Sequence, residues 1–391
     1  MGNKRLGSSA LFPTDTPIPP ARMIGRQNEV AAVAGSLGGG GNLIIAGPRR
    51  TGKTTVCDAA LTRLADDGHY VAAVDLFRLA DAADFAEHLA LATIANRGSL
   101  ARIALRARRA GRQLADAAAL TATVRARAEL GDDLELAFRP GLASNDPERY
   151  LTYALELPQR IATADGKRVI LFLDEFQEIV SPRRPFGDPD RLTKRMRAIF
   201  QRSPAVSFLF AGSIEHLMRD LFVPEERGLS QFGSFYPLAP IAPESWRVGI
   251  VERLAEDDCT IVSAALERLI AAGDGHPRTT MLIARWTHES SLVDETHKLT
   301  ETHVSAGIAA AQVADLPKHE QMLARIRALG RHAQRIAVRV ALGSQPYQGL
   351  NAKVASDTLH ALRDAGVVEQ TQPRSWQITD PLLRNFLAGL E

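Results

Sequence analysis

Leu43-Ile44-Ile45-Ala46 runs directly into Gly47-Pro48-Arg49-Arg50-Thr51-Gly52-Lys53-Thr54-Thr55, and this stretch decides the fold. An apolar strand that enters a glycine-containing loop and then a helix is the pattern of a P-loop. Glycines adopt backbone angles that other residues avoid, so successive amides turn inward and cradle a polyphosphate at the N-terminus of the helix. The sequence therefore predicts a nucleotide-binding loop at residues 47–55.

Two side chains of this loop have specific expected roles. Lys53 is expected to reach the β- and γ-phosphates of ATP, and the Thr54 hydroxyl is expected to be a ligand of the bound Mg²⁺. The alternative is a glycine-rich turn without a ligand. The segment Val56–Leu61 continues with apolar residues at helical spacing, and this context favours the P-loop, with ATP and Mg²⁺ as the cofactors.

Composition sets broad limits on the kind of protein. The chain has 391 residues, 45% of them hydrophobic, and a formal net charge of +2. This length predicts two or three domains with a sizeable core, and the charge is too small to indicate a polyanionic partner by itself. No apolar leader follows Lys4 and Arg5, and no stretch approaches the ~18 apolar residues of a membrane span. We therefore expect a soluble, cytoplasmic protein without a membrane partner.

The two cysteines, Cys57 and Cys259, lie far apart in the sequence in apolar helical contexts. Neither belongs to a recognisable metal-binding or redox motif. Both are therefore expected to be buried and reduced, as is usual in the cytoplasm.

A second chemical motif is the apolar run Val169–Leu173, which ends in Asp174 and Glu175. This is the pattern of a Walker B strand, in which Asp174 would hold Mg²⁺ through water and Glu175 would polarise the water that attacks the γ-phosphate. Two carboxylates could instead begin a helix, but the upstream P-loop disfavours that interpretation. The adjacent Glu is typical of ATPases that insert an extra strand between the P-loop and Walker B strands.

The neighbouring segments predict the rest of the sheet. Tyr70–Leu76 reads as a buried strand after the P-loop helix, and Val206–Ser213 reads as the strand after Walker B. Strands that alternate with helices indicate an α/β fold whose parallel sheet is covered on both faces. Ser213 ends its strand where a sensor 1 side chain would lie, although a serine in that place is usually only a turn former.

An arginine-rich insertion is expected at residues 97–139. It combines a helix that carries Arg106, Arg108 and Arg109 with a β-hairpin over Thr121–Phe138, where apolar and polar residues alternate. The arginines either form a solvated helix face or contact a nucleic acid or an acidic partner.

Taken together, these motifs carry a family resemblance. Ile24-Gly25-Arg26 before the P-loop resembles the adenine-side box of AAA+ ATPases. With the double arginine before Thr51-Gly52-Lys53 and with Leu173-Asp174-Glu175-Phe176, the chain resembles the archaeal-type ATPases of the STAND class, relatives of AAA+ proteins. The resemblance implies a P-loop NTPase core, a helical lid and a C-terminal winged helix.

The resemblance also implies site residues. Pro277 would lie against the adenine and Arg278 could act as sensor 2. Ser234 stands where many relatives carry an arginine, so an arginine finger would come from Arg219 or Arg227, or be absent. The expected nucleotide-binding residues are Gly25, Arg26, Gly47, Pro48, Arg49, Arg50, Thr51, Gly52, Lys53, Thr54, Thr55 and Pro277. The expected catalytic residues are Glu175, Lys53, Ser213 and Arg278, and the expected metal ligands are Thr54 and Asp174.

Four regions are predicted along the chain: a flexible tail at 1–20, the ATPase core at 21–240, the lid at 241–314 and the winged helix at 315–391. In the winged helix, Lys353 and Arg363 could meet DNA, but Asp357 and Asp364 on the same helix dilute the positive charge, and docking of a partner protein is the equal alternative.

These observations predict an ATP-binding molecular switch in which slow hydrolysis is coupled to the winged helix, with assembly into a homo-oligomer or contact with DNA or a partner protein. One alternative is an AAA+ ATPase of the initiator or transposition-helper type that assembles on DNA. Another is a nucleotide-dependent signalling scaffold with negligible turnover.

Overall fold

The computed structural model describes residues 7–14, 18–48, 50–97, 146–181, 186–372 and 374–390. The chain divides into two compact units. The sheet unit comprises Glu29–Gly47 and Val56–Pro237, and the helical unit comprises Met1–Asn28, Pro48–Thr55 and Leu238–Glu391. Apart from Arg97, the predicted arginine-rich helix and hairpin lie outside the described residues.

The sheet unit is built around five parallel strands. Their spatial order is β2-β3-β4-β1-β5, so β4 lies between the P-loop strand β1 and the Walker B strand β3. This order confirms the extra strand that the adjacent Glu175 predicted. The strands are β1 (Leu43–Ala46), β2 (Tyr70–Asp75), β3 (Val169–Asp174), β4 (Val206–Gly212) and β5 (Ser234–Phe235).

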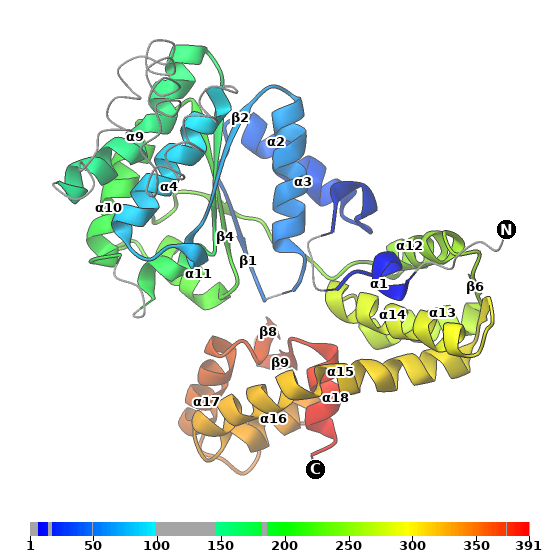
Figure 1. The fold of residues 1–391 in the computed structure, drawn as a ribbon. Helices are drawn as coiled ribbons and strands as arrows, with labels where there is room; N and C mark the ends of the chain where they lie inside the picture. The colour runs from blue at the N-terminus through cyan, green and yellow to red at the C-terminus, as the bar shows by residue number, and fades with distance from the viewer. Residues whose placement is uncertain are drawn as a thin grey trace, which may run out of the picture. The chain divides into compact units, whose positions relative to one another are not determined.

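Helices cover both faces of this sheet (Figure 1). In β3, Val169, Leu171 and Leu173 belong to the largest hydrophobic core, while Ile170 and Phe172, which point to the opposite face, are buried as well. Burial of successive residues is expected only where helices cover both faces of a parallel sheet. One face carries α2 (Gln27–Gly38) and α3 (Lys53–Asp66). The other carries α4 (Ala82–Ile94), α9 (Pro147–Asp165), α10 (Pro189–Phe200) and α11 (Glu215–Phe222).

Short 3₁₀ helices complete the described part of this unit. They are η2 (Leu76–Arg78), η3 (Ala95–Arg97) and η4 (Phe176–Val180), and η1 (Pro20–Arg22) lies before α2 in the chain. The turn η4 directly follows the Walker B acids, so the backbone bends sharply where the functional side chains lie.

The helical unit begins with a four-helix region that has its own core. On its first helix, α12, the residues Trp246, Ile250 and Leu254 recur at helical spacing along one face. They are buried together with residues of the other three helices. The helices are α12 (Pro243–Ala255), α13 (Ser263–Gly273), α14 (Pro277–Val293) and α15 (Glu301–Ala328), and the short parallel strands β6 (Thr260–Ile261) and β7 (Lys298–Leu299) pair between them.

The N-terminal residues correct the prediction of a flexible tail. Ser8–Leu11 form helix α1, and Leu11 and Phe12 are fully buried in the core of the four-helix region. The buried Arg253 of α12 donates hydrogen bonds to the carbonyl oxygens of Leu11, at 2.6 Å, and Arg22. Burial lowers the pKa of Arg253 to about 10, helped by the nearby charge of Arg22. The prediction rested on the glycine- and proline-rich composition of this segment and overlooked the apolar residues Leu11 and Phe12, which pack in the core.

Helix α15 continues from the four-helix region into the C-terminal region without interruption (Figure 1). The predicted boundary between the lid at 241–314 and the winged helix at 315–391 therefore falls inside one helix. Pro317 lies inside α15 and removes only one backbone donor, which a long packed helix tolerates. Leu323 and Ile326 at its end enter the C-terminal core.

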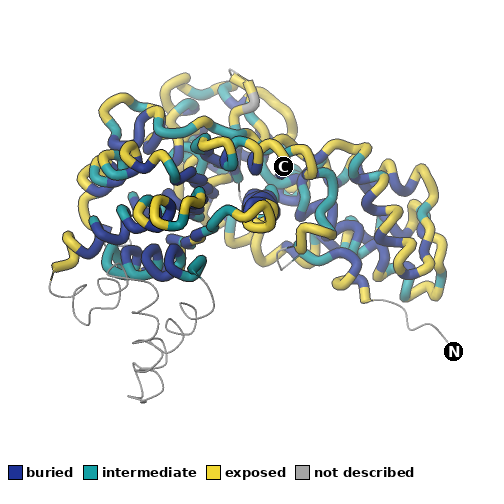
Figure 2. The backbone as a smooth tube through the Cα atoms, turned by 90° about the horizontal axis from the view of Figure 1, so that it is seen from above, coloured by how far each residue is buried: buried dark blue, intermediate teal, exposed yellow. Residues whose placement is uncertain are grey.

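The C-terminal region places three helices and a hairpin around this core. Ala355, Leu359 and Leu362 form the buried face of α17, and Figure 2 shows the same division between buried and exposed faces along other helices. The elements are α16 (Ala333–Ala341), α17 (Ala352–Asp364), the antiparallel strands β8 (Val368–Gln372) and β9 (Ser375–Ile378), and α18 (Pro381–Ala388). Within the described part of the chain, none of the helices has both the length and the apolar character needed to cross a membrane.

The buried N-terminal segment generates a stability prediction. Phe12→Ala should destabilise the helical unit by about 3–5 kcal/mol, because it empties a fully buried aromatic site. Urea unfolding followed by tryptophan fluorescence measures the effect, because Trp246, Trp286 and Trp376 all lie in the helical unit. Phe77→Ala is the matched control, since Phe77 is 51% exposed and its replacement should change stability by no more than about 0.5 kcal/mol. Equal urea midpoints for Phe12→Ala and the unmodified protein would contradict the packing of this segment.

Candidate nucleotide-binding site

The loop that follows β1 leaves the sheet beside the end of β4. The N–H of Gly47 donates to the carbonyl oxygen of Gly212 at 3.3 Å. Further along the loop, Gly52 has φ +87°, and Arg50 adopts φ +70°, an uncommon backbone angle for a residue with a side chain. Residues with positive φ among residues with negative φ turn successive N–H groups toward one side, which is the geometry of an anion-binding loop.

Lys53, the first residue of α3, already lies over this loop. Its Nζ donates to the carbonyl oxygen of Pro48 at 2.6 Å, and its side chain is buried. The Thr51 hydroxyl donates to the same oxygen at 3.0 Å. The ammonium group is thus held at the loop by a neutral acceptor, which a phosphate oxygen can replace with a stronger, charge-assisted hydrogen bond. Arg49 lies outside the described residues.

The predicted Gly25-Arg26 segment meets the loop. The guanidinium of Arg26 is almost completely buried, and its Nη2 donates to the carbonyl oxygen of Thr51 at 3.4 Å. Gly25 has φ +65°, and a Cβ atom there would lie 2.5 Å from the Cβ of Ser245 on α12. Only glycine satisfies both the backbone angle and this close approach. The segment that resembles an adenine-side box therefore lies next to the P-loop, and its contact with a nucleotide stays a prediction.

Pro277 and Arg278 begin helix α14, and Pro277 approaches the loop. The Cγ of Pro277 lies 4.0 Å from the point that a Cβ on Gly52 would occupy. His276 caps the helix: its Nδ1 accepts from the Thr279 N–H at 3.2 Å, so the neutral ring carries its proton on Nε2. The structure thus brings Pro277 to the loop. Arg278, the expected sensor 2, instead contacts an acidic residue of α15.

Arg278 is buried and paired with Asp315 of α15. Its Nη2 donates to Oδ1 of Asp315 at 2.8 Å, and Nη1 binds the other carboxylate oxygen. The Lys318 ammonium binds the same carboxylate at 2.9 Å. Burial would raise the pKa of Asp315, but the hydrogen bonds from Arg278 and Lys318 outweigh burial and lower it to about 2. Sequence analysis missed Asp315, because 37 residues separate it from Arg278.

The Walker B acids lie at the carboxyl end of β3 and are held tightly. The Glu175 N–H donates to Oδ1 of Asp174 at 2.9 Å, and Glu175 itself has a left-handed backbone with φ +49°. Oε2 of Glu175 accepts from the Ser213 hydroxyl at 2.7 Å and from Nε2 of Gln177 at 2.5 Å. Since β3 and β4 are paired neighbours, the residues that follow them meet at one edge of the sheet.

Gln177 completes this arrangement and was not predicted. Its Oε1 accepts from the Ser213 N–H at 3.3 Å, so Glu175, Gln177 and Ser213 form a closed hydrogen-bonded triad. We refer to these three residues as the Glu175 triad. The amide is buried on η4, the turn after the acids. A sequence signal existed, since Gln177 follows Glu175 by two residues and its side chain is long enough to reach back across a tight turn.

Comparison with known proteins agrees with this geometry. Residues 22–186 match the family model of the AAA ATPase domain, and this range contains both the Gly25-Arg26 segment and the Walker B acids. A Walker-type ATPase of Pyrococcus abyssi is 14% identical with a TM-score of 0.67, and the alignment covers 96% of this chain and 99% of that chain. No curated protein matches the sequence.

Two further solved structures share the architecture. The ORC2 protein of Aeropyrum pernix is 18% identical with a TM-score of 0.57, covering 99% of this chain and 97% of that one. Cdc6p of Pyrobaculum aerophilum is 13% identical with a TM-score of 0.50, covering 98% of both chains. At such identities the likeness establishes the fold. The chain has the P-loop NTPase fold.

In this P-loop NTPase, the two arginine-finger candidates each have an acidic neighbour. Arg219 on α11 pairs with Glu215 at 2.8 Å and lies over the ring of Phe235 at 5.3 Å. Arg227 pairs with Asp190 at 2.6 Å. Both side chains are substantially exposed and therefore exchange partners at little cost. A finger role for either remains a prediction.

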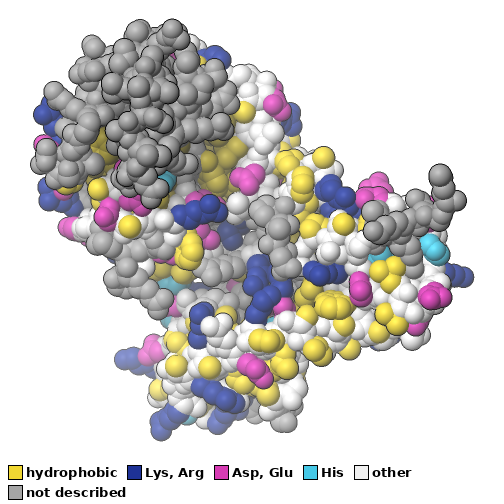
Figure 3. Space-filling view, viewed as in Figure 1, with side chains coloured by type: hydrophobic (Ala, Val, Ile, Leu, Met, Phe, Trp, Pro, Cys, Tyr) yellow, Lys and Arg dark blue, Asp and Glu magenta, His cyan; other side chains and the backbone are white. Residues whose placement is uncertain are grey.

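The C-terminal basic residues of this P-loop NTPase are dispersed. Lys353 is exposed in the first turn of α17, and Arg363 in its last turn contacts Asp364 at 3.3 Å. On the face seen in Figure 3, Lys and Arg side chains of this region are interspersed with acidic and hydrophobic ones. Arg106, Arg108 and Arg109 lie outside the described residues.

The cap of α14 generates a pH prediction. Burial lowers the pKa of His276, and the charges of Arg278 and Arg50 lower it further against the opposing effect of Asp380. The folded protein therefore keeps His276 neutral where the unfolded chain, with a pKa of about 6.5, binds a proton. Stability contributed by the neutral cap is present above about pH 6.5 and declines as the pH falls below it, by up to about 1.4 kcal/mol per pH unit.

His276→Asn should reduce this acid dependence, because asparagine caps the helix without titrating. Urea midpoints measured between about pH 7 and 5 test the expectation. Burial also lowers the pKa of His319, so a smaller slope should remain in the variant. An unchanged slope would show that His276 is not held neutral.

Proposed function

We propose that this protein is a molecular switch that binds Mg-ATP and hydrolyses it slowly. The observation that carries the proposal is the Glu175 triad at the carboxyl end of β3, with the P-loop beginning beside the neighbouring strand end at Gly47 and Gly212. The match of residues 22–186 to the AAA ATPase domain supports the same activity. The solved ORC2 protein, which shares the fold, was captured with ADPNP and ADP.

Nucleotide binding would use groups that the helical unit already holds in place. The loop N–H groups and the N-terminus of α3 supply partial positive charge for the phosphates. Lys53 would exchange the Pro48 carbonyl for a phosphate oxygen. Arg26 supports the loop through Thr51, and Pro277 lies close enough to Gly52 to limit the space beside it.

The residues also fit a Mg²⁺ ion. The Thr54 hydroxyl and the Asp174 carboxylate are oxygen ligands of the kind that Mg²⁺ prefers, and the Glu175 N–H bonded to Oδ1 orients the Asp174 carboxylate. When bound, the ion would neutralise charge on the β- and γ-phosphates. Thr54 and Asp174 are therefore the residues we assign to the metal.

Glu175 is the proposed general base, and its environment accounts for slow turnover. A base must accept a hydrogen bond from the attacking water. In the structure its Oε2 already accepts from Ser213 and Gln177, which fixes the carboxylate and occupies part of its capacity. Reorientation of the triad around a bound nucleotide would release Glu175 for catalysis, so Ser213 and Gln177 restrain the base.

Transmission of the nucleotide state would pass through Arg278. A γ-phosphate would compete with Asp315 for this guanidinium, and Asp315 lies on α15, which extends into the C-terminal region. Release of Asp315 would leave its buried carboxylate with Lys318 alone, a costly change that favours repacking of α15. The coupling of Arg278 to α15 supports our assignment of the chain to the STAND class. The order of helices and hairpin supports our assignment of the C-terminal region to the winged helices.

The first test separates binding from hydrolysis. Glu175→Gln should retain ATP but reduce the hydrolysis rate about 10²-fold or more, because the amide keeps the shape and loses the basic oxygen. Phosphate release under single-turnover conditions measures the rate, and equilibrium titration with a fluorescent ATP analogue measures binding. Wild-type turnover in this variant would leave Glu175 a structural residue.

Lys53→Ala is the matched control. It removes the ammonium that the loop aims at the phosphates and should abolish ATP binding and hydrolysis together. The same titration detects the loss. Negligible turnover by the unmodified protein, with ATP binding intact, would favour the alternative of a nucleotide-dependent scaffold.

Contact with DNA is the second candidate function, and it belongs to the initiator or transposition-helper alternative. It is supported by the exposure of Lys353 on the third helix of the C-terminal region, which precedes the hairpin as in a winged helix. A homo-oligomer or a partner protein could occupy the same helix, which also exposes Asp357 and Asp364.

Gel-shift assays with duplex DNA test this second function. The combined change Lys353→Ala and Arg363→Ala should weaken binding and lower the salt dependence by roughly one counterion per lost contact. Arg160→Ala, an exposed arginine of α9, is the control and should bind normally. If the combined change Arg106→Ala, Arg108→Ala and Arg109→Ala weakens binding instead, the contact lies in the insertion. No binding at low salt, with or without ATP, would eliminate the candidate.

A further inference from the structure

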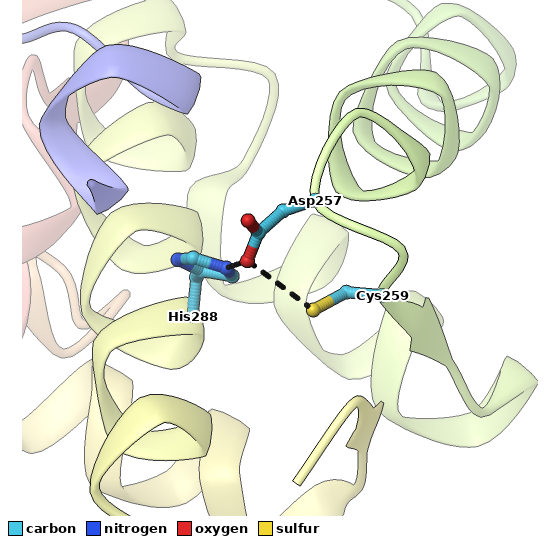
Figure 4. A group of neighbouring side chains, drawn as sticks. All are labelled: Asp257, Cys259 and His288. Carbon is cyan, nitrogen blue, oxygen red and sulfur yellow. Dashed lines mark hydrogen bonds and ion pairs between the residues drawn. The ribbon is translucent and has the colours of Figure 1, made fainter. Parts of the chain in front are cut away.

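Three chemically distinct ligating side chains gather in the four-helix region. Asp257 and Cys259 lie on the loop between α12 and β6, and His288 lies on α14 (Figure 4). Nε2 of His288 is 3.0 Å from Oδ2 of Asp257, and Sγ of Cys259 is 3.8 Å from the same oxygen. The three ligand atoms all lie within 4.8 Å of one another.

All three side chains are buried. His288 is 0% exposed and Asp257 is 4% exposed. A carboxylate this deep in a protein is costly unless a positive charge and hydrogen bonds compensate for lost water. A protonated imidazole of His288 or a bound cation would supply that positive charge.

A hydrogen-bond chain on the far side of the ring constrains the choice. The Ser8 hydroxyl donates to the Glu289 carboxylate at 2.6 Å and lies 2.8 Å from Nδ1 of His288. A hydroxyl has one proton, so Ser8 must accept from Nδ1–H. Neutral His288 therefore carries its proton on Nδ1, and its Nε2 presents a lone pair to the Asp257 carboxylate. Two acceptors 3.0 Å apart require a proton or a metal ion between them.

Cys259 favours the metal ion. The sulfur faces the same Asp257 oxygen as the imidazole, and a thiolate, an imidazole nitrogen and a carboxylate oxygen together are a ligand set suited to zinc. We propose that Asp257, Cys259 and His288 bind a structural Zn²⁺ ion. The carboxylate and the thiolate together carry two negative charges, so the occupied site is neutral, as burial requires.

Tetrahedral coordination of zinc would need a fourth ligand beside these three. Nδ1 of His297, an exposed residue just before β7, lies 3.9 Å from Sγ of Cys259. For tetrahedral zinc with bonds of about 2.0–2.3 Å, ligand atoms are separated by roughly 3.4–3.6 Å. The observed separations of 3.0 and 3.8 Å among the three clustered ligand atoms bracket that range. His297 is not part of that cluster, so it would become the fourth ligand only by moving toward the ion.

Such a site would fasten separate parts of the helical unit. It would join the loop after α12 to α14 and, through Ser8, to α1. The Ser8–His288 contact matches the usual arrangement in which a metal-bound histidine donates its other N–H to an acceptor that fixes the ring. Binding would displace the Cys259 thiol proton, so zinc affinity should fall as the pH falls.

The test uses the full-length protein and zinc alone. After chelation and reconstitution, inductively coupled plasma mass spectrometry should find one zinc per chain, and zinc should raise the melting temperature. Cys259→Ser and His288→Gln should each lower zinc affinity at least 10-fold. Cys57→Ser is the matched control and should bind normally, since Cys57 is buried in α3 of the sheet unit.

Two further measurements distinguish direct ligands from structural effects. Substitution with Co²⁺ should give a thiolate-to-cobalt charge-transfer band that Cys259→Ser abolishes and Cys57→Ser retains. Ser8→Ala leaves every ligand in place and should weaken zinc binding about 10–100-fold. Absence of zinc from the reconstituted unmodified protein, or a cobalt spectrum without the thiolate band, would overturn the site. These readouts do not depend on ATP hydrolysis, so Lys53→Ala should bind zinc normally.

Discussion

The parallel pairing of β4 with both β1 and β3 is the constraint on which the candidate site depends. Because all three strands run the same way, the residues that follow each of them emerge at one edge of the sheet. This places the start of the P-loop beside Gly212 and brings Ser213 to Glu175. The apolar runs of these strands are buried, and the polar residues that follow them stand at the edge of the sheet where we place the nucleotide.

Charge balance in the helical unit follows a second constraint, which is the cost of burying ionised groups. Arg278 and Asp315 are both almost fully buried and satisfy each other, and Lys318 adds a second cation to the carboxylate. Such a pair contributes little net stability but is costly to separate. A ligand that attracts Arg278 therefore acts on α15, which connects the four-helix region to the C-terminal core. In the proposed switch, Asp315 and the γ-phosphate of ATP would thus compete for the guanidinium of Arg278.

The same cost explains why the cluster of Asp257, Cys259 and His288 is informative. Ser8 fixes the ring proton of His288 from one side, and the carboxylate of Asp257 faces the ring from the other. The N-terminal helix α1 thus contributes both apolar anchors and a polar contact that orients a ligand. In this unit each of these buried carboxylates lies beside a positive charge. For Asp315 that charge is the guanidinium of Arg278, and for Asp257 it would be the proposed zinc ion.

The sequence alone determined the local chemistry of the nucleotide site. Glycine, lysine and hydroxyl residues at fixed spacing after an apolar strand predict a phosphate loop, and two acids after another such strand predict Walker B, because both motifs depend on contiguous residues. The strand order with β4 between β1 and β3 was also predictable from Glu175. Only the tertiary structure decided which distant residues meet. Asp315 meets Arg278, Leu11 and Phe12 enter a core, and Cys259 approaches His288. None of these pairs has a periodic or contiguous signature, since each arises from helices and loops that pack together after separations of up to hundreds of residues.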